Sequence, residues 1–469
     1  MLVASMSNLS SSKLVNLRLW QLSSTFTGTS AHLLISERLM AILALCFCLV
    51  WTSKAEAAID ARPIRDPQTN SQFISIMQAM DETLLNNPRV ASSRSQLGIT
   101  RALMAQATIY PNGGLEIDNG FHAENTFRFG AFLPIEPPWK MALRIIAAKK
   151  QLTQADLVMQ QQLWLLRGEV RRAYTEFVIA EESGQTLKDI TELTRALATV
   201  VEKRVETGDV PKLDLFKAQL ALAQAEVDSE AGDRRIVQAR EQLNVVMGRP
   251  FDSPTAAPPL GAFKISVVKN ELLPDLSQPL APLKDYVDMA LANRLEFKVI
   301  AQAINVNKTG LKLAYANILP NSQISAGRSI VTNGSGQPNT VGVYMTGQFP
   351  LPVLNVNQGE IKRISAIIRQ FRFEQEAQKN MISGQVDIAY RKLINARETM
   401  RNYQNRILAA SENVTHLAQL SYQNGQSDIT AALTAQQSNI QIRNQYLNNV
   451  MAYELAYTEL EQAVGKVLQ

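Results

Sequence analysis

The sequence predicts a mainly α-helical protein with a membrane β part, built from two tandem structural repeats. Three observations lead to this prediction. The chain matches itself at an offset of 216 to 217 residues, each copy contains long stretches with helical periodicity, and each copy contains one short pair of strands with alternating apolar residues. The offset relates Leu133-Pro134 to Phe349-Pro350 and, at one residue more, Gly208 to Gly425. A single slip of one residue over so long a match indicates duplication rather than chance.

Residues 1–57 are predicted to form a leader with a signal peptide that is cleaved. An apolar run from Leu39 to Trp51 follows a basic residue, and the segment Ala55-Glu56-Ala57 after it has the A-x-A form of a signal-peptidase site. We therefore expect cleavage between Ala57 and Ala58, followed by a flexible N-terminus over 58–71.

Two alternatives for the leader stay open. One is that translation starts near Met40. The other is lipid attachment at Cys46 or Cys48, which lie inside the apolar run, although the preceding Leu45 and Phe47 are not the small residues that lipid attachment requires. Because these are the only two cysteines in the sequence, the cleaved chain would contain none.

Composition argues against several classes of function. Charged residues make up 19% of the chain, the net charge is +5, and basic residues are interleaved with acidic ones rather than gathered in a stripe. A nucleic-acid partner is therefore not expected. Beyond the leader the only histidines are His122 and His416, and no phosphate loop or nucleophile constellation is present. The sequence predicts no enzyme, no catalytic residue, no metal site and no cofactor.

The first repeat is predicted over 72–250. It comprises a helix over 72–109, a strand pair over 113–134, a long helix over 138–206 and a helix over 212–247. Tyr110-Pro111-Asn112 ends the first helix, and Gly248-Arg249-Pro250 ends the last, with glycine just past the end and proline beyond. A connecting segment over 251–280 follows.

The second repeat is predicted over 281–466 in the same order. It comprises a helix over 282–318, a strand pair over 322–350, a long helix over 357–422 and a helix over 427–464. Apolar residues recur every seven positions along the long helix, in two sets three places apart: Val386, Leu393, Met400, Ile407 and Val414, and Ala389, Ala396, Tyr403, Ala410 and Leu417. This period predicts a coiled-coil seam sustained over five heptads.

Element lengths indicate the architecture. A helix of about 65 residues is roughly 100 Å long, and two helices of about 36 residues match it end to end. Each strand has the length that crosses a bilayer at a tilt, but four strands cannot close a barrel, and open sheet edges are not tolerated in lipid. Three copies would supply 12 strands. The alternative is a pair of surface hairpins on a soluble helical protein.

The chain resembles the TolC-like outer-membrane efflux factor family over residues 72–466. The resemblance rests on the tandem units, the segment Leu243–Gly248, and the motif Ser421–Ser427 with Ala435-Gln436-Gln437 downstream. It implies a homotrimer in which a 12-stranded outer-membrane β-barrel continues into a long α-helical barrel in the periplasm. It further implies a passive channel-tunnel of a tripartite efflux system, in contact with outer-membrane lipid, a periplasmic adaptor (membrane fusion) protein and an inner-membrane pump.

The resemblance leaves alternatives in function. The cargo would be small molecules, drugs or metal cations, and a duct for type I protein secretion is the alternative. A periplasmic adaptor, a coiled-coil scaffold and a secreted helical binding protein fit less well, because adaptors carry one helical hairpin flanked by β-domains rather than two tandem units.

The resemblance also implies roles for residues near the two interhelical turns. Thr207, Gly208 and Asp209, with Asn424, Gly425, Gln426 and Ser427, match the tip turns that face the adaptor. Tyr422 matches a tyrosine that helps to close the entrance, and Arg204, Asp214 and Lys217 complete the expected periplasmic gate. The alternatives are a plain turn, a packing tyrosine and a solvated arginine.

The chain departs from the family at the entrance. Some members carry acidic residues six and nine places after the second-unit glycine, where this chain has Ala431 and Thr434. The first-unit equivalents are Asp214 and Lys217, one helical turn apart on one face. This departure puts closure by charged rings and cation selectivity at the entrance in doubt.

Overall fold

The computed structural model describes residues 74–120, 125–256, 279–332 and 338–468. All of them belong to one compact unit, Arg65–Gln469. The predicted cleavage site at Ala57 and Ala58, the N-terminus over 58–71 and most of the connecting segment over 251–280 lie outside the described residues.

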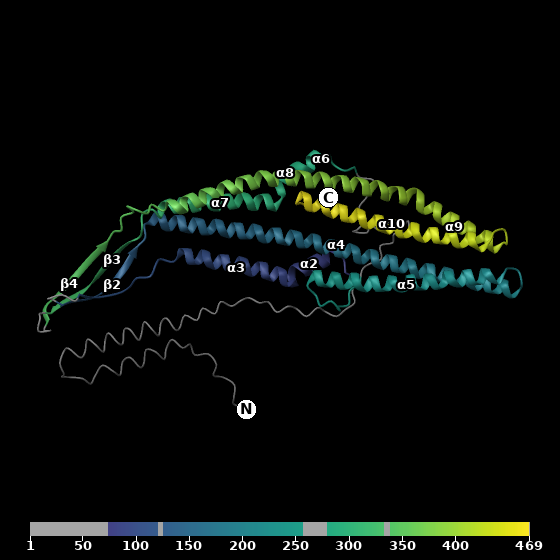
Figure 1. Ribbon diagram of the computed structural model, residues 1–469, viewed down its shortest axis with the longest axis horizontal. Helices are drawn as coiled ribbons and strands as arrows, with labels where there is room; N and C mark the ends of the chain where they lie inside the picture. The colour runs from purple at the N-terminus through teal and green to yellow at the C-terminus, as the bar shows by residue number, and fades with distance from the viewer. Residues whose placement is uncertain (1–73, 121–124, 257–278, 333–337, 469) are drawn as a thin grey trace, which may run out of the picture. The chain divides into compact units, whose positions relative to one another are not determined.

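Long helices and four strands alternate along the chain in the expected order (Figure 1). The first half contains α2 (Ile76–Asn86), α3 (Pro88–Thr108), β1 (Gly114–Gly120), β2 (Asn125–Ile135), α4 (Pro138–Glu206) and α5 (Lys212–Met247). The second half contains α6 (Leu283–Asn293), α7 (Leu295–Ala316), β3 (Ser322–Thr332), β4 (Pro338–Gln348), α8 (Gln358–Asn402), the π-helical turn η1 (Tyr403–Ile407), α9 (Leu408–Gln423) and α10 (Ile429–Val464). No helix among these is both long and apolar enough to cross a membrane.

The helices predicted over 72–109 and 282–318 are each broken once, which corrects the expectation of continuous helices. Asn87 is extended at φ −69° and ψ 126°, and its side chain accepts a hydrogen bond from the Arg89 amide at 2.8 Å, which caps α3. Arg294 is extended at φ −57° and ψ 125° between α6 and α7. Helical periodicity marks neither break, although Asn87-Pro88 combines a cap with a proline at the first helical position.

A glycine in the left-handed conformation packs against each of these two breaks. Gly248, at φ +81°, ends α5, and a Cβ there would lie 2.8 Å from the Cα of Asn87. Gly465, at φ +73°, ends α10, and a Cβ there would lie 3.1 Å from the Cα of Arg294. Both the backbone conformation and the close approach favour glycine.

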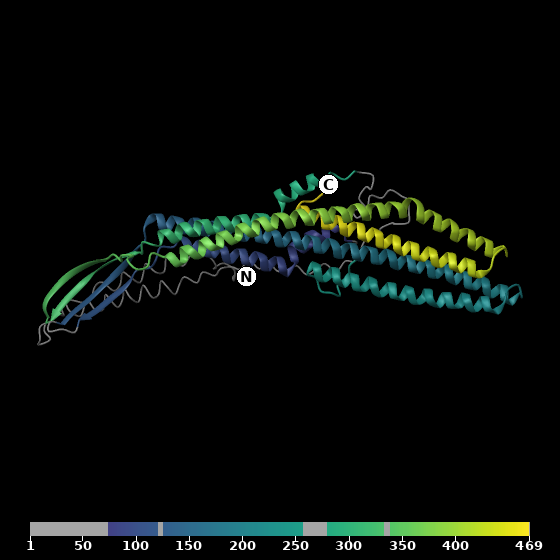
Figure 2. The same cartoon turned by 45° about the horizontal axis from the view of Figure 1, so that its top comes forward.

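The four strands form one antiparallel sheet in the order β1-β2-β3-β4. Alternate residues of each strand point to opposite faces of the sheet. One face is mainly apolar and exposed, and on it Val343 is 85% and Met345 is 79% exposed. The other face carries the polar residues, among them Asp118 opposite Arg128 across β1 and β2. The sheet lies at one end of the helices and the α4–α5 and α9–α10 turns at the other (Figure 1, Figure 2).

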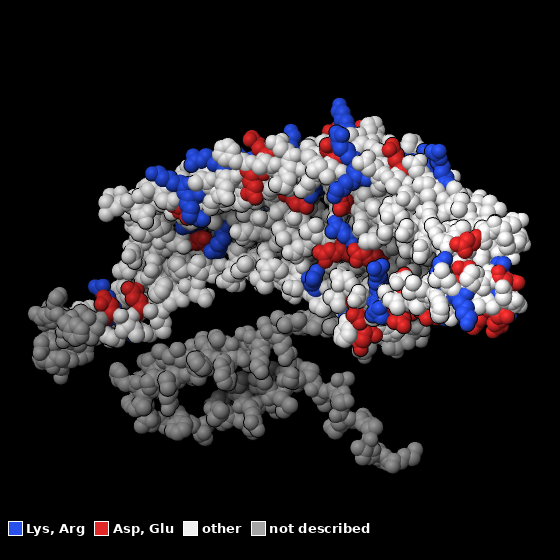
Figure 3. Space-filling model, turned by 45° about the vertical axis from the view of Figure 1, so that its right-hand side comes forward, with Lys and Arg blue, Asp and Glu red and all other residues white. Residues whose placement is uncertain are grey.

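Each long helix is accompanied by half-length helices. Helix α4 contacts α3 and α5 along its length and also α7 and α10, while the continuous run of α8, η1 and α9 contacts α7 and α10. Near the turns the contacts therefore follow the order α5, α4, α10, α9, and no α5–α9 contact of comparable extent is present among the described elements. Acidic and basic side chains are interspersed over the helices on the face in Figure 3.

The predicted seam is buried only in its first half. Val386, Leu393 and Met400 are 2% exposed or less, whereas Val414 is 58% and Leu417 is 63% exposed. C-terminal to η1, four less exposed positions each follow an expected seam position by one residue: Leu408, Ser411, Thr415 and Ala418. Tyr422 continues this new series and is buried. The π-helical turn takes up one extra residue, so the inward face moves by one position. The expectation of a continuous five-heptad seam is therefore wrong.

A buried ionic cluster joins α4 to α10. Arg171 lies 2.8 Å from Glu461 and 3.3 Å from Glu454, and Arg167 lies 3.3 Å from Glu461. Burial raises the pKa of Glu454 to about 7, although the positive charge of Arg171 opposes the rise. The Glu454 carboxyl is therefore partly protonated near pH 7.

Candidate functional site

The two interhelical turns are built alike. Gly208 at φ +79° is the second residue after the end of α4, and Gly425 at φ +71° is the second residue after the end of α9. The Asp209 amide donates to the Arg204 oxygen, and the Gln426 amide donates to the Ser421 oxygen, both at 2.8 Å. Each of these hydrogen bonds spans six residues and satisfies a carbonyl at the C-terminal end of a helix. This geometry requires a left-handed residue just past the helix end, which explains the glycines Gly208 and Gly425.

Most of the predicted tip-turn residues are exposed, and they come from two turns at the same end of the helices. The exposed ones are Thr207, Gly208, Asp209, Asn424, Gly425 and Gln426. Thr207 donates a hydrogen bond to Asp209 at 3.0 Å, which rigidifies the first turn. Ser427 is half-buried, and its hydroxyl makes no hydrogen bond among the described residues.

Arg204 and Tyr422 connect the two turns directly. The Arg204 Nη1 donates to the main-chain oxygen of Tyr422 at 2.9 Å, and the guanidinium carbon lies 5.0 Å from the centre of the Tyr422 ring. Tyr422 is 2% exposed and packs with Val201 and Ile429 in a small apolar cluster. Burial raises the pKa of the Tyr422 hydroxyl, which makes no hydrogen bond among the described residues.

Lys217 makes a second connection between the turns. Its Nζ lies 3.6 Å from the Asp214 carboxylate and donates to the Thr430 hydroxyl at 3.2 Å. Asp214 is buried at 7% exposure. The Thr430 hydroxyl, together with the charge of Lys217, lowers the pKa of the exposed Asp428. All four predicted gate residues, Tyr422, Arg204, Asp214 and Lys217, therefore lie in one cluster.

Sequence reasoning missed two members of this cluster, Asp428 and Thr430. Asp428 precedes the first residue of α10, where an acidic residue is a common helix N-terminal signal. Ala431 and Thr434, the neutral residues at the acidic positions of some family members, are exposed on α10. Among the described residues no group of three or more His, Cys, Asp or Glu side chains is placed to hold a metal ion.

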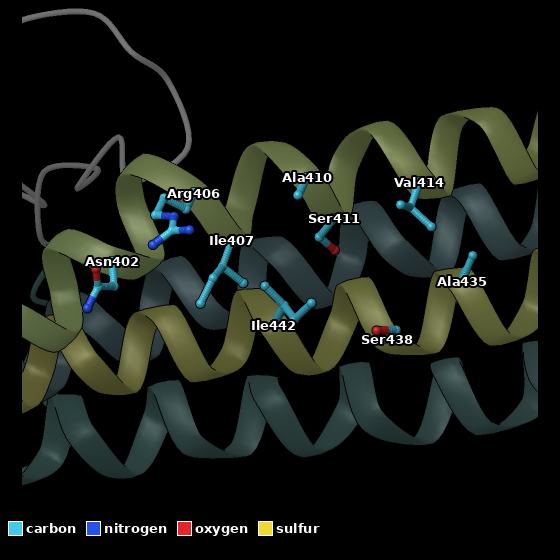
Figure 4. Close-up of a pocket in the computed structure, with 9 residues that line it drawn as sticks. All are labelled: Asn402, Arg406, Ile407, Ala410, Ser411, Val414, Ala435, Ser438 and Ile442. Carbon is cyan, nitrogen blue, oxygen red and sulfur yellow. The ribbon is translucent and has the colours of Figure 1, made fainter.

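A groove of about 620 Å³ runs between α9 and α10 beside the turns (Figure 4). One wall carries Ile407, Ala410 and Val414, and the other carries Ala435, Ser438 and Ile442. Ile407, Ala410 and Val414 are predicted seam positions, and the extra residue of η1 leaves them on the outer side of the helix rather than facing the chain's own core. Nothing in the sequence pattern signalled this groove, because the apolar period continues through η1 without a break.

The described residues form a four-stranded antiparallel sheet joined to paired long helices with two glycine turns. The chain matches no protein-family model. It is 22% identical over 404 residues to the cobalt-zinc-cadmium resistance protein CzcC of Cupriavidus metallidurans, and the match covers 85% of this chain and 92% of CzcC.

Solved structures give the same fold. CusC, described in terms of transmembrane channel formation, superposes with a TM-score of 0.65 at 16% identity, over 84% of this chain and 93% of CusC. The CmeC outer membrane channel of Campylobacter jejuni superposes with a TM-score of 0.63 at 15% identity, over 86% of this chain and 90% of CmeC. The resemblance to TolC-like outer-membrane efflux factors is thereby confirmed, and the chain shares the fold of these channels.

Proposed function

We propose that the chain is the subunit of an outer-membrane channel-tunnel, a passive duct in a tripartite efflux system with a periplasmic extension. The observation that carries this proposal is the sheet with one exposed apolar face and one polar face. A large exposed apolar surface is unfavourable in water. The apolar face would instead lie against lipid and the polar face would line an aqueous lumen.

The free edges of the sheet support a homotrimer. Strands β1 and β4 are the edges of the four-stranded sheet and pair with no further described strand. Edge strands in lipid leave main-chain groups without hydrogen bonds, so they must pair with other copies. Three copies would form 12 strands, an even number within the range of bacterial barrels.

The edges of the helical layer support the same assembly. On α5, Leu213, Phe216 and Leu220 are 61%, 64% and 74% exposed at heptad spacing. On α9, Leu417 and Leu420 are 63% and 40% exposed, three residues apart and outside the groove. Because α5 and α9 lie at opposite ends of the order α5, α4, α10, α9, the α5 edge of one copy would pack on the α9 edge of the next.

Cross-linking tests this assembly. Phe216 lies eight residues after Gly208 and Leu417 lies eight residues before Gly425, so both sit at one level above the turns. The double variant Phe216→Cys with Leu417→Cys should form covalent oligomers under mild oxidation. Each single variant is the matched control and should stay monomeric on denaturing gels. Oligomers from the single variants, or none from the double variant, would contradict the edge pairing.

The exposed turns and the groove beside them support docking of a periplasmic adaptor. The groove begins roughly 15 Å from the α9–α10 turn, since Val414 precedes Asn424 by ten residues of helix. Ser438→Cys in this groove should cross-link to an adaptor in intact cells, whereas Val227→Cys, exposed on α5 farther from the turns, is the control. Equal cross-linking at both positions would argue against a specific docking surface.

The cargo is proposed to be small molecules, with metal cations the first to test because CzcC is a cobalt-zinc-cadmium resistance protein. Deleting the gene should raise sensitivity to metals or drugs in a panel, and the secreted proteome should stay unchanged. Loss of a secreted protein with unchanged sensitivity would favour type I secretion. Release of the protein with periplasmic contents, rather than extraction from outer membranes by detergent, would overturn the channel itself.

A further inference from the structure

Arg328 is a basic residue on the mainly apolar face of the sheet. It lies opposite Phe129 on β2 and opposite Val343 on β4. Along β3, the residues of the same face on either side are Ala326 and Ile330. The Arg328 side chain is exposed, so its guanidinium is presented to whatever surrounds this face.

No carboxylate of the described strands shares a face with Arg328. Glu116 and Asp118 lie on the opposite face of the sheet, because they pair with Gly130 and Arg128, whereas Phe129 shares the face of Arg328. Asp118 lies 4.0 Å from Arg128, on the polar face. Because a second copy of the chain brings the same strands with the same parity, those strands supply no acidic neighbour for Arg328 either.

The position of Arg328 along the strand indicates its depth. Chain direction places Ser322 at the end of β3 next to the helices and Thr332 at the far end. Arg328 is six residues from Ser322 and four from Thr332, so its Cα lies just beyond the middle of the strand on the far side. Its distance from Thr332 is roughly 13 Å along the strand, at about 3.3 Å per residue, and the tilt of barrel strands makes it roughly 10 Å along the bilayer normal. Basic residues on the lipid face are disfavoured at the middle of a bilayer and tolerated near its interfaces, where their long side chains extend to the headgroups.

We infer that Arg328 binds the phosphate of an anionic lipid in the leaflet that faces the exterior. A planar guanidinium suits bidentate hydrogen bonding to phosphate oxygens, and the neighbouring Phe129, Ile330 and Val343 suit the acyl chains of the same molecule. A lipid therefore fits this surface, whereas free phosphate would leave the apolar neighbours in water. The inference rests on the proposed function, since it requires the sheet to lie in a bilayer.

The test measures lipid retention by the full-length protein in detergent with native mass spectrometry. The wild type and Arg328→Gln are each incubated with lipid A and, separately, with phosphatidylcholine. Wild type should retain lipid A at least about tenfold more than Arg328→Gln, as expected for loss of hydrogen bonds to a charged group. Arg328→Lys, which keeps the charge without the planar fork, should be intermediate. Arg128→Gln on the polar face is the control and should retain lipid A like the wild type.

Three outcomes would overturn the inference: equal lipid A retention by Arg328→Gln and wild type, equal loss in Arg128→Gln, or displacement of lipid A by inorganic phosphate at matched concentration. Failure of the proposed function is separate and is read from bilayer insertion. If the wild type inserts and conducts but Arg328→Gln binds lipid A normally, only this inference fails. If the wild type does not insert at all, the channel assignment and this inference fail together.

Discussion

The Arg204 guanidinium donates a hydrogen bond to the main-chain oxygen of Tyr422 at 2.9 Å, across 218 positions of the chain. This contact ties the end of α4 to the end of α9, and the guanidinium also lies over the tyrosine ring. The proposed gate therefore contains a contact made within one chain, and it uses the backbone and the ring face of Tyr422 rather than its hydroxyl.

Loss of the Arg204 contact should open the proposed channel. Arg204→Ser with Tyr422→Phe is expected to raise ion conductance in planar bilayers. Removing a charged hydrogen bond and a cation–π contact destabilises the closed arrangement by about 1–3 kcal/mol per chain, which favours the open form by roughly 5- to 150-fold per chain. Arg204→Ser alone should give most of the effect, and Tyr422→Phe alone little, because the Tyr422 hydroxyl makes no hydrogen bond among the described residues. Unchanged conductance in the double variant would remove the gate assignment.

Glu454→Gln should make stability less dependent on pH. The Glu454 pKa is raised to about 7 in the folded chain from 4.5, so the folded state holds this proton more tightly than the unfolded state. The resulting stabilisation is present at low pH and is lost as pH rises through about 7. The loss is on the order of 3 kcal/mol at pH 8. Burial raises the pKa of the neighbouring Tyr453 and Tyr457 to about 12, so both stay neutral in this range.

The measurement is the apparent melting temperature from pH 5 to pH 8. The wild type should lose more stability over this range than Glu454→Gln, so the difference in favour of the variant grows with pH. Arg171 keeps its contact with Glu461 in the variant, which limits the cost of the substitution. A parallel decline of both proteins would show that Glu454 does not titrate in this range.

Two glycines of the sheet should respond differently to alanine. A Cβ on Gly327 would collide with the main-chain oxygen of Phe129 on the neighbouring strand, whereas a Cβ on Gly342 meets nothing within 4 Å. Gly327→Ala is therefore expected to destabilise the sheet by about 1–3 kcal/mol, since the backbone has to shift. Heat-modified mobility on gels should fall for Gly327→Ala and stay normal for Gly342→Ala. Equal heat-modified mobility of the two variants would mean that β2 and β3 do not approach each other closely at Gly327.

Deletion of Gln404 from η1 should be tolerated. A single deletion normally rotates the rest of a helix by about 100° and misplaces its packed face. Within η1 it would remove the extra residue and leave an ordinary α-helix with Thr415 and Tyr422 still facing inward. Deletion of Glu376 in the regular helix α8 is the control and should abolish folding. The yield of the proposed trimer from membranes compares the two variants, and loss of the Gln404 deletion variant would contradict the one-residue shift.

The sequence anticipated the order of elements and several of their ends, because caps and prolines are local signals. The long helices expected from 138 and 357 begin at Pro138 and Gln358. The break at Asn87 was missed although Asn87-Pro88 is a local boundary signal, a cap followed by proline. The break at Arg294 has no such signal, and the contact with Gly465 that accompanies it leaves no trace in local periodicity.

The π-helical turn was missed for a similar reason. The apolar heptad passes through Tyr403–Ile407 unchanged, so the sequence alone predicts one seam. Within the gate, sequence reasoning named Arg204 and Tyr422 but not their geometry, since the acceptor is a main-chain oxygen that leaves no side-chain pattern. Thr430 was missed because a hydroxyl on a helix is usually unremarkable without its partner, Lys217.

The contact between Arg204 and Tyr422 has a consequence for cooperativity, because both residues belong to the same chain. Its release in one subunit leaves the equivalent contacts of the other copies intact. A trimer would then open through independent steps, with one, two or three subunits released, instead of switching as a whole. Single-channel records should in that case show intermediate current levels, and an adaptor that binds fewer than three subunits would produce a partly open duct.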